Sequence, residues 1–298
     1  MKKPRMALAV GILCISIFPL LVKLGYTSGL ISAFYRMAIA FIVLLPVVLW
    51  KNQWKLPSLS LTLLALLSGV LFGCDVAFWN IAIVESTATQ ASLLTNLSPI
   101  WVGIITFLFL KNKPSSNFWM GTLIALLGMI TIVGFQFFIA FQFNRAFIFG
   151  LLSGVFYAFY LLISKRVLAQ VNILSFMFMS LFSSAIFLGF INFAAGEDFY
   201  GYTLKTWMVL IIQAVVCQLL AWFSLSYAIK HIRTTRVSLS LLAQAFITAL
   251  LAWLFLNEAI SLQMILGGLV LLVGIGITFI DKPITFQNLF SKRKLSIK

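Results

Sequence analysis

Long apolar runs separated by short polar stretches dominate the chain. Each run is about 18 to 25 residues long, the length that an α-helix needs to cross the hydrocarbon core of a bilayer. The pattern predicts an all-α membrane protein with ten transmembrane helices. The ten apolar runs lie at residues 6–24, 30–50, 59–83, 88–110, 118–138, 146–163, 173–195, 204–229, 237–256 and 262–280.

The composition agrees with this pattern and excludes a nucleic-acid-binding protein. Of the 298 residues, 62% are hydrophobic and only 9% are charged, whereas a soluble domain carries about 25% charged residues. The net charge of +15 would suit a nucleic-acid partner if the basic residues formed a patch. They lie instead in short stretches between the apolar runs, where lysine and arginine act as topology signals.

The positions of the basic residues predict the orientation. With a cytoplasmic N-terminus, 17 of the 21 lysines and arginines fall on the cytoplasmic side. Only Arg145 and Lys205 fall on the opposite side, and Lys23 and Arg36 lie at or within helices. Because cytoplasmic loops carry an excess of positive charge, we expect a multi-pass protein of the cell (inner) membrane with both termini in the cytoplasm.

An internal repeat divides the chain into two halves. Paired residues recur at a spacing of 146, including Ser115 with Ser261, and the glycines 121 and 128 with 267 and 274. The predicted division is a first five-helix repeat at 1–140, a second at 141–283 and a basic cytoplasmic tail at 284–298. Because five is odd, the second repeat enters the membrane from the opposite side. Such inverted repeats are typical of alternating-access carriers.

The residues that most enzymes and cofactor sites require are scarce. The one histidine lies in a basic loop, and the three cysteines fall inside apolar runs without the spacing of a metal site. No Gly-x-x-x-x-Gly-Lys loop for ATP phosphates occurs. We therefore expect no enzyme, no cofactor and no metal. A channel or a purely structural membrane protein remains an alternative to a carrier.

The stretch AWLFLNEAISLQMILGGLVLLVGIGITFI runs from the ninth apolar run into the tenth and contains Asn257 and Glu258. It resembles the EamA-like family of the drug/metabolite transporter superfamily, in which a glycine stands in the place of Asn257. The matching stretch of the first half contains the expected Pro99 but has Lys111-Asn112-Lys113 where the glutamate would be. The resemblance covers essentially the whole chain. It implies export or exchange of amino acids, other small metabolites or amphipathic drugs.

Asp75 is the one acidic residue that lies clearly inside an apolar run. A carboxylate in hydrocarbon is costly unless it is paired or lines a wet cavity, so it is a functional candidate. Arg36 lies at a similar predicted depth, and an Asp75–Arg36 pair is plausible. The pair would be a structural salt bridge, or Asp75 would bind a substrate ammonium group or a coupling proton.

Pro99 falls near the middle of the fourth run and removes a backbone hydrogen bond there. Asn96 and Ser98 flank this break, and the repeat places Gln244 at the depth of Ser98. Interrupted helices at corresponding places in two halves indicate a transporter binding site. A tolerated kink with interhelical hydrogen bonds is the alternative.

Several further side chains are candidates for a substrate pocket near Asp75. An aromatic surface beside a carboxylate suits an amphipathic amine or an amino-acid side chain. The candidates are Trp79, Asn80, Tyr157, Tyr160 and Trp222. The glycine pairs of the fifth and tenth runs predict close packing of those two helices, with a dimer seam as a further possibility.

The resulting hypothesis is a secondary transporter that exports amino acids or related small metabolites by alternating access, as a monomer or a homodimer. Its site would lie between helices 1, 3, 4, 6, 8 and 9. If transport is coupled to protons, Asp75 would be the titrating group. The alternative is uptake or exchange of a bulkier cationic metabolite or an amphipathic drug.

Overall fold

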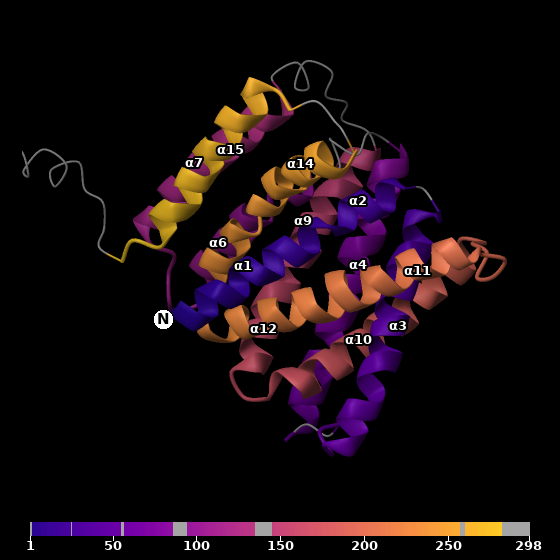
Figure 1. The fold of residues 1–298 in the computed structure, drawn as a ribbon. Coiled ribbons are helices and arrows are strands. Elements are labelled where there is room, and N and C mark those ends of the chain that lie inside the picture. The colour runs from indigo at the N-terminus through magenta and orange to yellow at the C-terminus, as the bar shows by residue number, and fades with distance from the viewer. Residues whose placement is uncertain are drawn as a thin grey trace, which may run out of the picture.

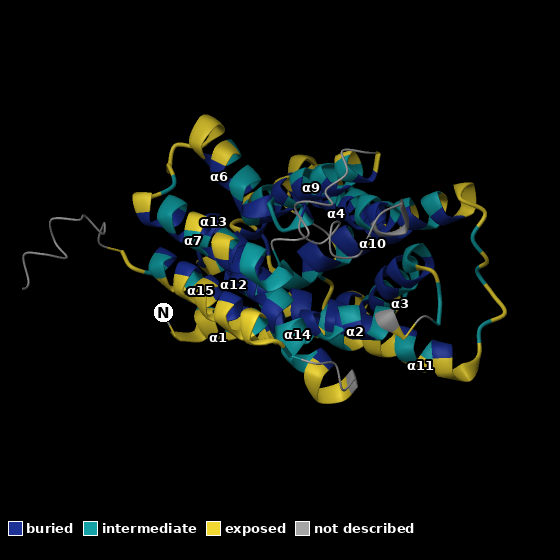
Figure 2. Ribbon diagram, turned by 90° about the horizontal axis from the view of Figure 1, so that it is seen from above, coloured by how far each residue is buried: buried dark blue, intermediate teal, exposed yellow. Residues whose placement is uncertain are grey.

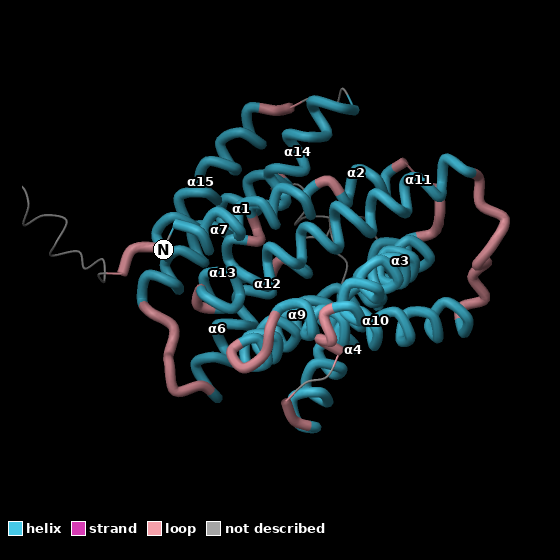
Figure 3. The backbone as a smooth tube through the Cα atoms, turned by 60° about the horizontal axis from the view of Figure 1, so that its bottom comes forward, coloured by secondary structure: helices cyan, strands magenta, loops and turns pink. Residues whose placement is uncertain are grey.

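The computed structural model describes residues 2–24, 26–54, 57–85, 94–134, 145–256 and 260–281, and all regular secondary structure in these ranges is helical (Figures 1 and 3). The helices are α1 (Lys2–Ser16), α2 (Phe18–Lys23), α3 (Gly29–Trp50), α4 (Leu59–Glu85), α6 (Ser98–Phe109), α7 (Ser116–Val133), α9 (Arg145–Leu168), α10 (Ile173–Ala194), α11 (Leu204–Ile212), the π-helix η1 (Gln213–Leu220), α12 (Ala221–His231), α13 (Thr234–Ser240), α14 (Ala243–Leu256) and α15 (Leu262–Thr278).

Eight helical stretches within the described residues are long and apolar enough to cross a membrane. The fourth and tenth apolar runs contain shorter helices there, at Ser98–Phe109 and Leu262–Thr278. Many exposed residues are large and apolar, including Leu266, Leu269 and Val273 of α15. Figure 2 shows exposed positions in yellow along the outside of the helix bundle. Such an apolar exterior suits lipid and not water. The protein is therefore a multi-pass membrane protein, while the count of ten spans and the cytoplasmic termini stay predictions.

Side-chain caps fix where several helices begin. Ser115 accepts a hydrogen bond from the backbone N–H of Phe118 at 3.2 Å, and Ser261 accepts one from Met264 at 3.1 Å. An N-cap hydroxyl satisfies a backbone donor that has no partner within the helix. These two serines are 146 residues apart, so the same cap starts the corresponding helices α7 and α15.

Three of the membrane helices are interrupted near their middle. The first breaks at Ile17, where Pro19 sits in the first turn of α2 and cannot donate a backbone hydrogen bond. The ninth breaks at Leu241 and Leu242, between α13 and α14, without any proline or glycine. In the eighth, the π-helix η1 separates α11 from α12. The fourth run likewise contains a turn at Asn96 and Leu97, directly before α6.

The two glycine pairs join α7 to α15, which lie together at one edge of the bundle (Figure 1). A Cβ atom at Gly121 would lie 2.5 Å from the carbonyl oxygen of Gly274, and one at Gly267 would lie 2.7 Å from that of Gly128. Only hydrogen fits at these positions, because backbone lies directly opposite. The predicted close packing is confirmed. The glycines meet inside one chain, so they do not form a dimer seam.

The helix pairs between the two halves come in matched sets. The third apolar run packs on the sixth through α4 and α9, and the eighth packs on the first through α12 and α1. If each helix is replaced by its counterpart in the other half, the pair of helices three and six becomes the pair of helices eight and one. The pairs α3 with α10 and α7 with α15 each join corresponding helices. The contacts therefore follow the two-fold arrangement that an internal repeat requires.

We predict that Gly274→Ala lowers the stability of the folded protein by about 1–3 kcal/mol, because the added methyl group meets the backbone of α7. Its Cβ would lie 2.5 Å from the backbone nitrogen of Ala125. The matched control is Gly276→Ala on the same helix, where nothing lies within 4 Å. Thermal unfolding of the purified variants in detergent measures both. An equal melting temperature for the two variants would contradict the close packing.

Candidate functional site

A cavity of about 490 Å³ lies between the two halves of the described chain. The helix predictions placed the site between helices 1, 3, 4, 6, 8 and 9, and all six contribute lining residues. Helix 2 adds Arg36, and α7, the fifth helix, adds the apolar side chains of Met129, Ile132 and Val133. The lining is therefore mainly apolar with a few polar and charged groups, as in most small-molecule sites.

Asp75 lies on α4 inside this cavity and is 7% exposed. Ser153 of α9 donates a hydrogen bond of 2.6 Å to its Oδ1 atom. The Ser153 hydroxyl also lies 2.9 Å from the hydroxyl of Thr95, in the segment before α6. Asp75, Ser153 and Thr95 therefore form a chain of polar contacts that joins the third, sixth and fourth helices at the cavity.

Two glycines lie near Ser153 on one face of α9. A Cβ atom at Gly154 would lie 3.2 Å from the carbonyl oxygen of Thr95, and one at Gly150 would lie 2.8 Å from Leu94. These glycines let α9 approach the segment before α6 closely. The spacing of Gly150, Ser153 and Gly154 along one helix face is a signal in the sequence that points to this approach.

Asp75 and Arg36 both line the cavity, but no salt bridge or hydrogen bond joins them among the contacts of the described residues. The Arg36 guanidinium instead lies over the ring of Phe18 at 4.1 Å and near the ring of Phe72 at 5.9 Å. The break between α1 and α2 places Phe18 there. The sequence analysis did not single out Pro19, which marks this break.

Aromatic rings form one side of the cavity. Phe72 and Trp222 meet edge to face with their centroids 4.7 Å apart, and Tyr157 meets Trp222 at 6.2 Å. Trp79 also lines the cavity, one turn along α4 from Asp75. Tyr160 contacts both Phe72 and Trp222 but faces a second, much smaller space behind them. The sequence analysis did not single out Phe72.

The interruptions of the helices open into the same cavity. Thr95, Asn96 and Ser98 line it from the turn before α6, and Gln244 lines it from the start of α14. The breaks before α6 and between α13 and α14 fall at nearly equivalent positions of the two halves. Thr248 of α14 donates to the carbonyl oxygen of Ser16 at 2.9 Å, which satisfies an acceptor beside the break in the first helix.

Three of the predicted site residues do not line the cavity. Pro99 is buried in the first turn of α6, where its missing N–H costs nothing, instead of kinking a continuous helix. Asn80 is buried on α4, where it donates to the carbonyl oxygen of Val76 at 2.8 Å. Tyr160 is the third. The eight that line the cavity are Arg36, Asp75, Trp79, Asn96, Ser98, Tyr157, Trp222 and Gln244.

The lining of the cavity supplies several groups that can contact a bound solute. Among the described residues, no three histidine, cysteine, aspartate or glutamate side chains gather where they would hold a metal ion. What the cavity offers is one carboxylate, one guanidinium, amide and hydroxyl groups, and aromatic faces. This set can hold a small solute with both polar and apolar parts.

Comparison with known proteins decides the family. The model of the EamA-like transporter family matches residues 5–134 and again residues 144–280. The chain belongs to the EamA-like transporter family. Asn257 and Glu258, which carry part of the resemblance in the sequence, lie outside the described residues. As an EamA-like transporter, the protein handles a small-molecule substrate in a lipid bilayer.

Similar proteins leave the substrate of this EamA-like transporter open. One is the "Uncharacterized transporter YdfC" of Bacillus subtilis, 23% identical over 257 residues, which cover 86% of this chain and 83% of that protein. Another is an "Uncharacterized transporter" of Archaeoglobus fulgidus, 26% identical over 260 residues, which cover 83% of this chain and 86% of that protein. Neither name specifies what is carried.

A solved structure shares the fold of this EamA-like transporter. It is titled "Crystal structure of protein" and has a TM-score of 0.78 at 16% sequence identity. The match covers 99% of this chain and 100% of that chain. At this level of identity the likeness concerns the fold alone, so the assignment of roles within the cavity has to come from its own side chains.

We predict that Ser153→Ala destabilises the protein by about 1–3 kcal/mol, because a buried carboxylate loses its hydrogen-bond donor. The matched control is Ser184→Ala on α10, since the Ser184 hydroxyl is equally buried but has no partner. The melting temperatures of both variants in detergent test this. If Ser184→Ala costs as much as Ser153→Ala, the hydrogen bond to Asp75 is not what stabilises the site.

Proposed function

We propose that this protein is a secondary carrier that exports amino acids or related small metabolites across the cell (inner) membrane by alternating access. The observation that carries the proposal is the cavity itself. It lies where the two halves meet, it contains one acid and one base, and interrupted helices from both halves open into it. Irregular backbone at membrane depth is tolerated only where protein buries it or where it lines a water-filled cavity.

The inverted arrangement of the halves is part of this proposal. Carriers of this type move one half against the other around a site at their interface. Segments that we predict on the same side of the membrane also contact each other in the structure. At one end the Ser28 hydroxyl donates to Glu197 at 2.7 Å. At the other end the Lys165 ammonium donates to the carbonyl oxygens of Lys230 and Ile232, each at 2.9 Å.

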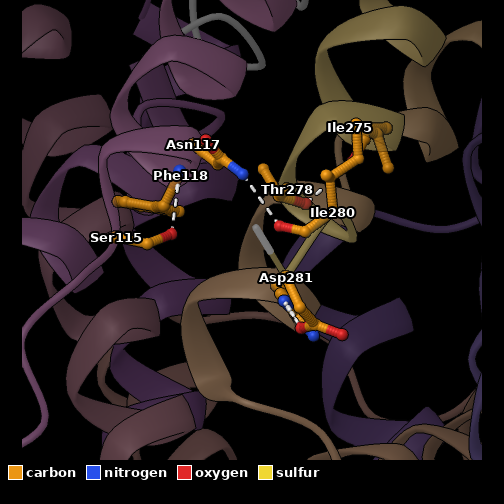
Figure 4. A network of polar contacts seen from close by, with 8 residues as sticks. Ser115, Asn117, Phe118, Ile275, Thr278, Ile280 and Asp281 are labelled. Carbon is orange, nitrogen blue, oxygen red and sulfur yellow. Dashed lines mark hydrogen bonds and ion pairs between the residues drawn. The ribbon is translucent and has the colours of Figure 1, made fainter. Parts of the chain in front are cut away.

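In alternating access the cavity must be closed at one end at a time. A polar network ties the far end of the α7–α15 pair to neighbouring helices (Figure 4). Asn117 donates to the carbonyl oxygen of Ile280 at 2.8 Å, and Arg236 of α13 pairs with Asp281 at 2.6 Å. Met129, which lines the cavity, lies about 18 Å further along α7 than Asn117. We propose that this network closes the predicted cytoplasmic end.

Asp75 has two roles in the proposed cycle. Its carboxylate would bind a positively charged group of the substrate, and it would take up a proton if transport is proton-coupled. Arg36 from α3 and Tyr157 from α9 line the cavity with it, so these groups set its electrostatic surroundings together with Ser153. A buried carboxylate in a membrane helix that faces a cavity is the usual position for such a coupling group.

Flux measurements test the function. Labelled amino acids and labelled amphipathic cations are offered to vesicles in which the purified protein has a defined orientation. We expect saturable movement of at least one amino acid, competed by unlabelled solute. Flux that does not saturate and that unlabelled solute does not reduce would indicate a channel. An absence of flux for every solute would contradict the metabolite-carrier proposal.

The second prediction for transport concerns Asp75→Asn. The amide keeps the shape of the side chain but cannot carry a charge or exchange a proton, so we expect loss of pH-dependent transport with a folded protein. Initial rates between pH 5.5 and 8.5 measure this, and gel filtration checks folding. A variant with the wild-type pH profile would exclude Asp75 as the coupling group.

We predict that Asp281→Asn loosens the end of α15. Arg236 lowers the pKa of the Asp281 carboxyl below its ordinary value. The ion pair therefore persists above the ordinary aspartate pKa of about 3.9 and is lost only as pH falls through the lowered pKa. Hydrogen exchange of residues 275–281 should rise at pH 7 in the variant and should stay unchanged in the wild type down to pH 5.

The control for this prediction is Asp198→Asn. Asp198 is exposed in the segment between α10 and α11, and it makes no ion pair among the described residues. Its substitution should leave the exchange of residues 275–281 at the wild-type level. Unchanged exchange in Asp281→Asn as well would exclude the ion pair as a closure element.

A second candidate function is uptake or exchange of a bulkier cationic metabolite or an amphipathic drug. The observation in its favour is the aromatic side of the cavity, where Trp79, Tyr157 and Trp222 lie with Asp75. A carboxylate beside aromatic faces suits an organic cation. The same flux panel separates this function from the first, because the cations would move and the amino acids would not.

A further inference from the structure

The cavity contains a buried cation that forms no salt bridge or hydrogen bond with any described residue. Arg36 is only 3% exposed, and its Nε–H group has no hydrogen-bond partner. Among the described residues, none accepts a hydrogen bond from its guanidinium and none forms a salt bridge with it. Its guanidinium lies 4.1 Å from the ring centroid of Phe18 and 5.9 Å from that of Phe72.

Aromatic rings satisfy only part of what a buried guanidinium requires. A ring face attracts the positive charge, but it does not replace the hydrogen bonds that five N–H donors lose when water is removed. A charge left unpaired in the protein interior is costly. The planar donor fork of arginine matches a carboxylate, which can accept two parallel hydrogen bonds. The rings therefore hold the guanidinium in place and leave its donors for an anionic group.

Asp75 presents the complementary charge in the same cavity. Only its Oδ1 atom has a hydrogen bond in the described structure, from Ser153. The second carboxylate oxygen remains available to a donor in the cavity. Arg36 and Asp75 are the two lining residues with a basic or a carboxylic side chain, and no salt bridge or hydrogen bond joins them. The cavity thus offers one site for an anion and a separate site for a cation.

We infer that Arg36 binds the carboxylate of the substrate and Asp75 binds its ammonium group. The site then selects zwitterions of the amino-acid type over solutes that carry a positive charge alone. This inference rests on the proposed carrier function. It adds to that function the residue that binds the negatively charged group of the substrate. It also separates the two candidate functions, since an amphipathic cation has nothing to neutralise Arg36.

The test compares three solutes that share one side chain and differ only in charge. Phenylalanine carries both groups, phenethylamine carries only the amine, and 3-phenylpropionate carries only the carboxylate. Leucine, isoamylamine and 4-methylpentanoate form a second series for an aliphatic side chain. Binding to the full-length protein in nanodiscs is measured through tryptophan fluorescence, because Trp79 and Trp222 line the cavity.

We expect Arg36→Gln to weaken binding of the amino acid and of the carboxylic acid at least tenfold, and to change binding of the amine less than twofold. Asp75→Asn should weaken the amino acid and the amine but not the acid. Arg36→Lys keeps the charge without the bidentate fork, so its loss should be smaller and confined to the two carboxylate solutes. The matched control is Arg166→Gln, an exposed arginine of α9.

Equal losses for all three solutes in Arg36→Gln would overturn the inference, because they would show that Arg36 only shapes the cavity. Binding of none of the amino acids and acids by the wild-type protein would also overturn it. Gel filtration and melting temperatures show whether each variant folds, and Arg36→Lys provides the same comparison if Arg36→Gln does not.

Failure of the proposed function gives a different result. Charge-selective binding that depends on Arg36, together with an absence of saturable flux in vesicles, would exclude the carrier and leave the assignment of Arg36 intact. Saturable amino-acid flux with equal effects of Arg36→Gln on all solutes would exclude the assignment and leave the carrier intact.

Discussion

A chain in hydrocarbon has to satisfy its own backbone hydrogen bonds, and the rest of this structure depends on that constraint. It makes the described fold helical, and it makes each interruption of a helix a place that needs support from a neighbour. The break after α1 receives a hydrogen bond from Thr248. The breaks before α6 and between α13 and α14 both open into the cavity. The polar site therefore lies where the backbone is irregular.

Close contacts between helices position the polar groups. Gly150 and Gly154 bring α9 against the segment before α6, and the packing of α9 on α4 places the Ser153 hydroxyl 2.6 Å from Asp75. Glycines 121, 128, 267 and 274 join α7 to α15 in the same way. In lipid there is no hydrophobic drive between helices, so packing of this kind and interhelical hydrogen bonds provide the contacts. The contacts that pack the helices therefore also hold the polar groups of the site in position.

Only part of the candidate site could be predicted from local features of the sequence. Asp75 and Arg36 were recognisable because charged residues inside apolar runs are rare, and the cavity contains both. No salt bridge or hydrogen bond joins the two side chains in the described structure. Phe18 lies over the Arg36 guanidinium, and Ser153 donates a hydrogen bond to one oxygen of Asp75. Ser153 lies 78 residues from Asp75, whereas Phe18 lies in the helix that precedes Arg36. A serine and a phenylalanine among so many others carry no local signal of such a role.

The sequence by itself determined the helical membrane class, the repeat at a spacing of 146 and the glycines of the α7–α15 contact. It could do so because hydrophobic run length and glycine spacing are properties of single helices. Only the tertiary structure decided which charged and aromatic side chains share the cavity, and it revealed the break between α13 and α14, which no proline or glycine marks. These features depend on contacts between distant segments, which no local pattern encodes.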